Sequence, residues 1–133
     1  MAQLDGSLRA ALEGKSFWHV ATVNPDGSPQ VTPMWVHTKG DQIAINTALG
    51  RKKTRNMQSN PKVALSWLDP DNAYHTINVQ GTIVSSHVGP TAEAEIDSLA
   101  KKYIGEDVYP WRSPGEQRIG FVIDVDHVTS MGE

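Results

Sequence analysis

The sequence predicts a mainly β protein in which a six-stranded antiparallel sheet curls into a barrel, with short helices inserted between strands. Three observations predict this fold. Six segments are rich in β-branched and aromatic residues. Turn signals such as Asn24-Pro25-Asp26-Gly27 separate them at short intervals. Consecutive hairpins of this kind favour a barrel, and 133 residues suffice for one domain, which we expect to span residues 1–133.

Each element follows from its local pattern. Leu4, Leu8 and Leu12 recur at four-residue spacing, which is typical of an amphipathic helix. Gly81 interrupts a long strand pattern and predicts a bulge or a point of close packing. Thr91 is the expected N-cap of the last helix. The expected strands are 15–23, 28–37, 42–47, 62–68, 74–85 and 117–128, and the expected helices are 5–13, 51–59 and 91–103.

The composition argues against several classes of site. There is no cysteine, so disulfides, thiolate metal sites and cysteine nucleophiles are excluded. The five histidines never fall three or four residues apart, so we expect no metal site. No apolar stretch approaches the ~20 residues of a membrane span, and no signal peptide is evident, so we expect a cytoplasmic protein. No nucleophile elbow, glycine-rich nucleotide motif or convincing acid pair is present, and the catalytic residues stay unknown.

A run of positive charge is the most informative feature. The net charge is −3, yet no acidic residue lies between Asp41 and Asp69. The run Arg51-Lys52-Lys53-Thr54-Arg55 follows a predicted strand and opens a predicted helix. A solvated helix face is the alternative for any charge run. Here, however, cations crowd the end of a helix where backbone amides and the dipole favour an anion. Phosphate fits best, because arginine binds it bidentately and lysine adds a point charge.

Nucleic acid is the competing anion for such a run. Proteins that bind single strands combine a basic groove with exposed aromatic platforms. In this sequence the aromatic residues lie within apolar strand patterns, and the net charge is negative. We therefore expect a small phosphate-bearing ligand and no nucleic acid.

Four motifs carry a resemblance to a known family. They are Val31-Thr32-Pro33-Met34-Trp35, Ile43-Ala44-Ile45-Asn46-Thr47, Gly50-Arg51-Lys52-Lys53-Thr54-Arg55-Asn56-Met57 and Asn60-Pro61-Lys62-Val63-Ala64-Leu65. In this order they resemble the split β-barrel proteins related to pyridoxamine 5′-phosphate oxidase, and within these the class that binds the deazaflavin coenzyme F420. The resemblance covers about residues 14 to 127. It implies a six-stranded, FMN-binding-like split β-barrel.

The resemblance also implies a homodimer with cofactors in clefts between the protomers. Arg51 and Lys53 would be the main phosphate ligands, with Lys52, Arg55 and Asn56 close by. The other implied cofactor residues shape the phosphate loop or run beside the ring: Thr32, Pro33, Met34, Trp35, Asn46, Thr47 and Gly50. Substrate residues are expected from position, in part from the second protomer: Trp67, Tyr74, His75 and Trp111. Core packing is the alternative for each tryptophan.

Departures from the oxidases of this family bear on the expected activity. Those enzymes place a serine before the Arg-Lys pair, where this chain has Gly50, and His75-Thr76 stands where they carry an Arg-Gln pair. Oxidation of pyridoxamine phosphate is therefore not expected. The resemblance instead implies an oxidoreductase that transfers a hydride from reduced F420 to an unsaturated or conjugated acceptor. Two alternatives stay open: an oxidoreductase that binds FMN, and a non-catalytic protein that carries F420 or binds haem.

Overall fold

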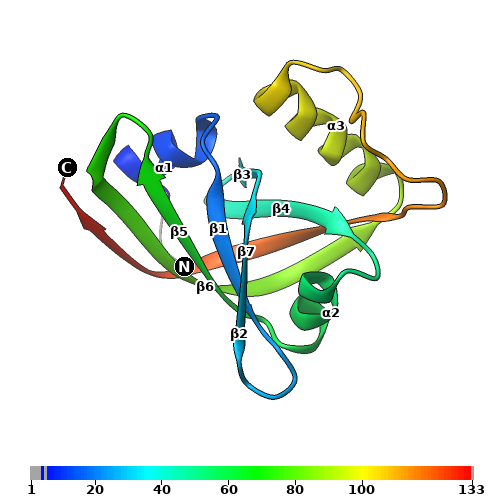
Figure 1. Cartoon of the computed structure of the whole chain (residues 1–133), viewed down its shortest axis with the longest axis horizontal. Helices are drawn as coiled ribbons and strands as arrows, with labels where there is room; N and C mark the ends of the chain where they lie inside the picture. Colours follow the sequence, from blue (N-terminus) through cyan, green and yellow to red (C-terminus); the bar gives the residue numbers. More distant parts are fainter. Residues whose placement is uncertain (1–3, 5, 133) are drawn as a thin grey trace.

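A computed structural model of the chain describes residue 4 and residues 6–132. In chain order the elements are α1 (Gly6–Glu13), β1 (Trp18–Val23), β2 (Pro29–Met34), β3 (Val36–Lys39), β4 (Gln42–Ala48), α2 (Lys52–Ser59), β5 (Lys62–Asp69), β6 (Asn72–Val88), α3 (Pro90–Ile104) and β7 (Arg118–Met131). The strands pair in one antiparallel sheet (Figure 1). None of the described helices is long and apolar enough to cross a membrane. The predicted mainly β architecture is confirmed.

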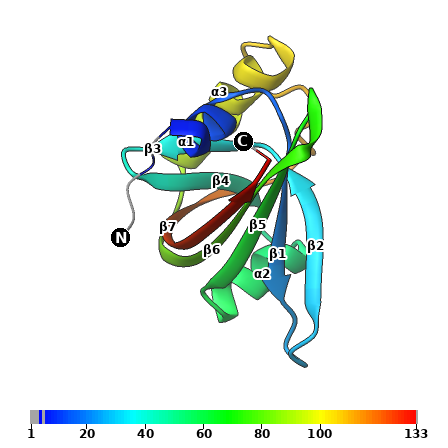
Figure 2. The ribbon, with the colours of Figure 1, turned by 90° about the vertical axis from the view of Figure 1, so that its left-hand side faces the viewer.

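The predicted strand 28–37 is wrong in one respect, because the structure divides it into β2 and β3 and the sheet has seven strands. In the order β2-β1-β5-β6-β7-β4-β3 these two strands form opposite edges, yet only Trp35 separates them in the chain. The sheet therefore curls until its edges meet at Trp35 (Figure 2). We call this meeting point, Met34 to Val36, the seam. Pro33 lies in the edge strand β2 next to the seam, a position that suits proline because it donates no hydrogen bond to a neighbouring strand.

The remaining predicted elements are present with shifted ends. β1 begins at Trp18 and not at residue 15, and β7 continues to Met131. The last helix begins at Pro90 with Gly89 as its N-cap, so the prediction of Thr91 as N-cap is wrong. Proline suits the first helical position, because its missing N–H has no acceptor there in any case. The predicted start of the first helix at residue 5 lies outside the described residues.

Alternating burial along the strands builds the core. In β5, Val63, Leu65 and Trp67 are buried and the residues between them are exposed. Trp67 stacks on Trp18 of β1 with ring centroids 6.2 Å apart. The buried leucines of α1, Leu12 among them, join this core. α2 packs against β1, while α3 packs against β4, β6 and β7 (Figure 1).

Gly81 marks a close approach between β6 and β7. The register of the two strands shifts between Gln80 and Gly81, which confirms the predicted bulge. A Cβ atom at Gly81 would lie 2.6 Å from Ile123 Cγ2 and 2.9 Å from the carbonyl oxygen of Asp124. Both distances are shorter than any relaxed carbon contact, so only glycine fits without a shift of the sheet.

We expect Gly81→Ala to lower the free energy of unfolding by about 1–3 kcal/mol, because overpacking displaces backbone and side chains. Chemical denaturation measures it. Gly14→Ala is the matched control, since its new Cβ would lie 3.4 Å from the Ala10 carbonyl oxygen, which is an ordinary contact. Equal stabilities of the two variants would contradict the close packing at Gly81.

Candidate functional site: a basic and aromatic cleft at the seam

A cleft of about 390 Å³ opens beside the seam. This volume lies within the range of small-ligand sites. Basic side chains line one part of it, and aromatic and aliphatic side chains line the rest. The lining residues are Lys15, Phe17, Pro33, Met34, Trp35, Asn46, Arg51, Lys53, Ile96, Leu99, Tyr103, Ile104, Tyr109, Trp111 and Arg118.

Three cations, Arg51, Lys53 and Arg118, converge at the basic end. The helix α2 begins at Lys52 directly after the extended N-cap Arg51, so the predicted position of the basic run is confirmed. Burial lowers the pKa of Lys53, and the charges of Arg51 and Arg118 lower it further. Within the described residues, the ion pairs of these three cations involve one carboxylate, Glu116, at 3.6 Å from Arg51 and 3.2 Å from Arg118. The uncompensated positive charge favours a bound anion.

The loop before α2 is held in place by local contacts. Gly50 has φ +91°, a conformation that residues with a side chain rarely adopt. The hydroxyl of Thr54 donates to the carbonyl oxygen of Ala48 at 2.6 Å. The guanidinium of Arg55 donates to the carbonyl oxygen of Gly50 at 2.5 Å. These contacts fix the backbone that presents Arg51 to the cleft.

Arg118 is a buried cation at the start of β7. Its Nε donates to Asn46 Oδ1 at 2.9 Å, and Asn46 in turn donates to the carbonyl oxygen of Ala92 on α3 at 2.9 Å. The guanidinium lies 5.1 Å from the centre of the Tyr109 ring. Among the described residues, its Nη2 has no hydrogen-bond partner. Arg118 therefore has donor capacity left for a ligand in the cleft.

Stacked rings form the aromatic end of the cleft. Trp35 lies parallel to Tyr103, with centroids 5.2 Å apart and an interplanar angle of 7°. Tyr109 and Trp111 meet Trp35 at 6.0 and 6.3 Å. The Tyr103 hydroxyl accepts the backbone N–H of Val36 at 3.2 Å, which ties α3 to the seam. Trp111 is 61% exposed, so its ring forms an outer wall that a planar ligand can reach.

Tyr109 and Trp111 lie on the loop that follows α3, and Arg112 anchors this loop to the helix. Arg112 Nη1 donates to Asp97 Oδ1 at 2.9 Å, and its Nη2 donates to the carbonyl oxygen of Glu93 at 2.9 Å. The backbone N–H of Tyr109 donates to the same Asp97 oxygen at 2.9 Å. The carboxylate of Asp97 on α3 thus accepts hydrogen bonds from both Arg112 and the Tyr109 backbone, and so holds the loop against the helix.

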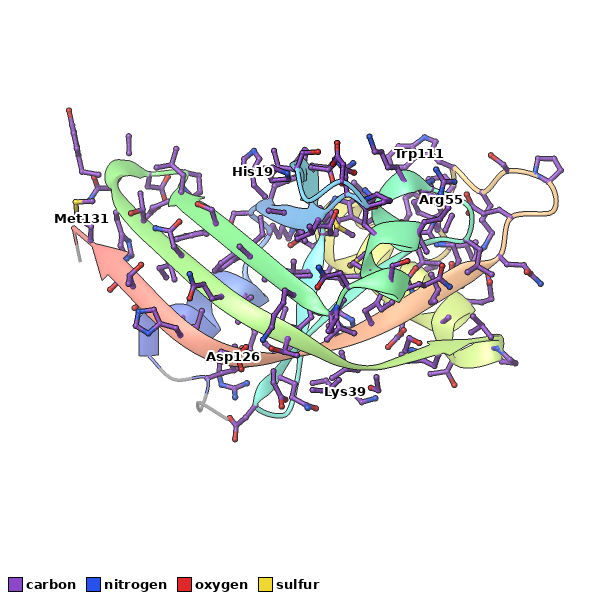
Figure 3. All side chains as sticks on the ribbon, turned by 90° about the horizontal axis from the view of Figure 1, so that it is seen from below. His19, Lys39, Arg55, Trp111, Asp126 and Met131 are labelled. Carbon is purple, nitrogen blue, oxygen red and sulfur yellow. The ribbon has the colours of Figure 1, made fainter. Side chains whose placement is uncertain are left out.

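Many of the predicted cofactor residues meet in this cleft. Thr32 lies at its margin and accepts from Lys53 Nζ at 3.3 Å. Figure 3 places Trp111 and Arg55 toward one end of the molecule and Met131 at the opposite end. The predicted site residues that line the cleft itself are Pro33, Met34, Trp35, Asn46, Arg51, Lys53 and Trp111.

Other predicted cofactor residues support the cleft from outside. Thr47 is buried behind the loop, and Lys52 and Arg55 are exposed at the start of α2. Asn56 is buried and donates to Thr22 Oγ1 at 3.0 Å, which anchors α2 to β1. Thr47, Arg55 and Asn56 keep the loop and α2 in place through these contacts, whereas Arg51 and Lys53 line the cleft.

Three predicted substrate residues do not line the cleft within one protomer. Trp67 is 6% exposed and joins the core, as the packing alternative expected. Tyr74 is 83% exposed near the tip of the β5–β6 hairpin. His75 lies beside Asp69 on the same hairpin. A substrate role for these three stays a prediction that requires a second protomer.

The sequence interpretation missed several lining residues, chiefly Phe17, Tyr103, Tyr109 and Arg118. Residues 105–115 show no periodicity, so nothing in that stretch distinguished Tyr109 from a surface residue. Arg118 did leave a signal, because a lone arginine directly precedes the apolar run 119–123. A buried charge in such a position needs a partner or a ligand.

Comparisons with known proteins identify the family of this chain. The family model of pyridoxamine 5′-phosphate oxidase matches residues 4–132. A solved F420 reductase is 32% identical and superposes with a TM-score of 0.83, over 94% of this chain and 98% of that one. The chain therefore belongs to the pyridoxamine 5′-phosphate oxidase family of split β-barrels, as the motifs implied.

More distant structures share the fold. A conserved hypothetical protein from Mycobacterium tuberculosis is 21% identical, with a TM-score of 0.72 over 98% of this chain and 88% of that one. An FMN-binding protein from Syntrophomonas wolfei subsp. wolfei is 12% identical, with a TM-score of 0.67 over 94% and 84% of the two chains. An F420 reductase and an FMN-binding protein thus share this fold.

We expect Arg112→Ala to accelerate hydrogen exchange of the Tyr109 amide by roughly tenfold or more, since a lost hydrogen bond to a charged group is worth about 1.5 kcal/mol or more. Lys101→Ala is the matched control. The Lys101–Asp107 pair joins the same loop and helix, but the two side chains are 65% and 85% exposed, and exposed pairs contribute little. Similar exchange in both variants would mean that Arg112 does not hold the loop.

Proposed function

We propose that this protein is an oxidoreductase that binds coenzyme F420 in the cleft and reduces an unsaturated or conjugated small molecule. The observation that carries this proposal is the convergence of Arg51, Lys53 and Arg118 beside a wall of aromatic rings. A ligand that joins a phosphate to a planar ring matches both ends of the cleft. The 32% identity to an F420 reductase supports this cofactor over FMN.

The chain offers a defined place for each part of that ligand. Arg51 and Lys53 would hold the phosphate, with the first backbone amides of α2 as further donors. The lowered pKa of Lys53, caused by burial and by neighbouring cations, indicates a site that an anion would relieve. Arg118 would bind a second polar group of the ligand. The residues proposed to run beside the ring are Thr32, Pro33, Met34 and Trp35.

The protein itself needs only to bind the cofactor and the acceptor and to orient them toward each other. When bound, reduced F420 supplies a hydride. The acceptor takes up this hydride and one proton, from solvent, Tyr74 or His75, and is thereby reduced by two electrons. The aromatic wall of Trp35, Tyr109 and Trp111 would hold the acceptor against the cofactor ring and exclude water from one side. This explains why no catalytic triad is needed.

We also propose that two protomers form a homodimer around the cofactors. Exposed apolar side chains on β2, β5 and β6 favour contact with a second copy of the chain. They are Val31, Leu68 and Tyr74, which are 60%, 52% and 83% exposed. The absence of cysteine supports a reducing, cytoplasmic setting.

The phosphate site is tested by titrating F420 into the protein and following its absorbance or fluorescence. We expect Arg51→Ala and Lys53→Ala each to weaken binding by about 1–3 kcal/mol, the scale of a lost hydrogen bond to a charged group. Lys62→Ala is the matched control, because Lys62 belongs to the same acid-free stretch but is exposed on β5 and does not line the cleft.

If the Arg51→Ala, Lys53→Ala double variant bound F420 with unchanged affinity, the basic run would be a solvated surface and not a phosphate site. A parallel titration with FMN separates the cofactors: binding of FMN without F420 would overturn the choice of F420. Binding of F420 without reduction of any conjugated acceptor would favour a carrier.

A further inference from the structure

Among the described residues, one carboxylate pairs with two of the three cations at the basic end of the cleft. Glu116 Oε1 lies 3.6 Å from Arg51 Nη2, and Glu116 Oε2 accepts from Arg118 Nη1 at 3.2 Å. The Glu116 side chain is only 8% exposed. None of the described residues that line the cleft itself is acidic. Glu116 therefore acts on a bound ligand through space and through the two arginines, without lining the cleft.

The backbone around Glu116 fixes the position of its carboxylate. The Glu116 N–H donates to the carbonyl oxygen of Ser113 at 3.0 Å, which closes a turn. The carbonyl oxygen of the next residue, Gln117, accepts the Leu49 N–H at 2.9 Å, and this bond ties the turn to the chain just before α2. Glu116 thus depends on more than the two arginines for its place.

Glu116 leaves both arginines able to bind a ligand. Its contact with Arg51 is longer than a hydrogen bond, and the Arg51 side chain donates no hydrogen bond to any described residue. Arg118 Nη2 makes none either. This atom keeps accessible surface, because the fully buried, unpaired side-chain atoms of the described residues are His37 Nε2 and His75 Nε2. The carboxylate therefore lowers the charge of the site without occupying its free donors.

The charge of Glu116 changes which anion the basic end prefers. The neighbouring carboxylate of Glu93 is paired with Arg112 at 3.2 Å, so Glu116 is the carboxylate that offsets the three cations. The interaction energy of two charges scales with their product. A phosphomonoester carries a charge of about −1.5 to −2 at pH 7, whereas a phosphodiester carries one negative charge. Glu116 therefore repels a monoester up to about twice as strongly as a diester.

We propose that Glu116 is a specificity-determining residue, whose negative charge beside Arg51 and Arg118 shifts the preference of the cleft from a phosphomonoester toward a phosphodiester. The phosphate of F420 is a diester, and that of FMN is a monoester. Glu116 thus favours F420 by repelling its competitor more strongly. This inference rests on the proposed phosphate site, which it extends to the charge of the phosphate.

The probes are two esters of the F420 ring system, which share the ring and the ribityl chain. One is the ribityl 5′-phosphate, a monoester, and the other is the methyl ester of that phosphate, a diester. Glu116→Gln keeps the size of the side chain but removes its charge. At about pH 7.5 we expect this variant to bind the diester roughly three- to tenfold more tightly than the wild type does. The monoester should gain roughly tenfold to a hundredfold, because its charge is nearly twice as large. Fluorescence titration measures both affinities.

The ratio of the two affinities separates charge from structure. Glu116→Asp keeps the charge and should keep the wild-type ratio. Glu106→Gln is the matched control, because Glu106 is exposed on the same loop and pairs with no cation of the cleft among the described residues. If Glu116→Gln does not fold, Glu116→Ala should show the same change of ratio. An unchanged ratio in a folded, uncharged variant, or equal weakening of both probes, would overturn the proposal.

Titration of the wild type with F420 distinguishes this inference from the proposed function. If F420 binds but the ratio does not respond to the charge of Glu116, the inference alone is overturned. If the wild type binds neither F420 nor either probe, the phosphate site fails, and the inference fails with it.

Discussion

The closure of the sheet at Trp35 is the constraint on which the rest of the structure depends. The chain passes from one sheet edge to the other through this single residue, so β2 and β3 cannot separate without opening the barrel. The Trp35 ring stacks on Tyr103 at 5.2 Å, and this contact brings α3 to the seam. The cleft therefore forms where the barrel closes, with strand residues on one side and a helix with its following loop on the other.

The loop before α2 sets the positive charge at the basic end of the cleft. Gly50 allows the turn, and Thr54 and Arg55 hold the backbone, so Arg51 and Lys53 are presented next to Arg118. Like charges held this closely destabilise an empty site and favour one that contains an anion. Burial, followed by the charges of Arg51 and Arg118, lowers the pKa of Lys53, and these same cations are the ones proposed to bind the anion.

The sequence predicted the parts of the fold and site that depend on local patterns. The alternation in β5, the bulge at Gly81 and the basic run at the start of α2 are short-range features, and each is present. The split of residues 28–37 was missed because backbone pairing across the barrel decides it and neither strand's own pattern does. Tyr103, Tyr109 and Arg118 were missed for the same reason: they reach the cleft from distant segments that only tertiary packing brings together.

A crystal structure of the complex with F420 tests the central claim most directly. The account predicts the cofactor phosphate within hydrogen-bonding distance of the Arg51 guanidinium and the Lys53 ammonium, at the N-terminus of α2, with the deazaflavin ring beside residues 32–35. A phosphate bound elsewhere, with Arg51 and Lys53 still facing a cleft that holds no part of the cofactor, would contradict it.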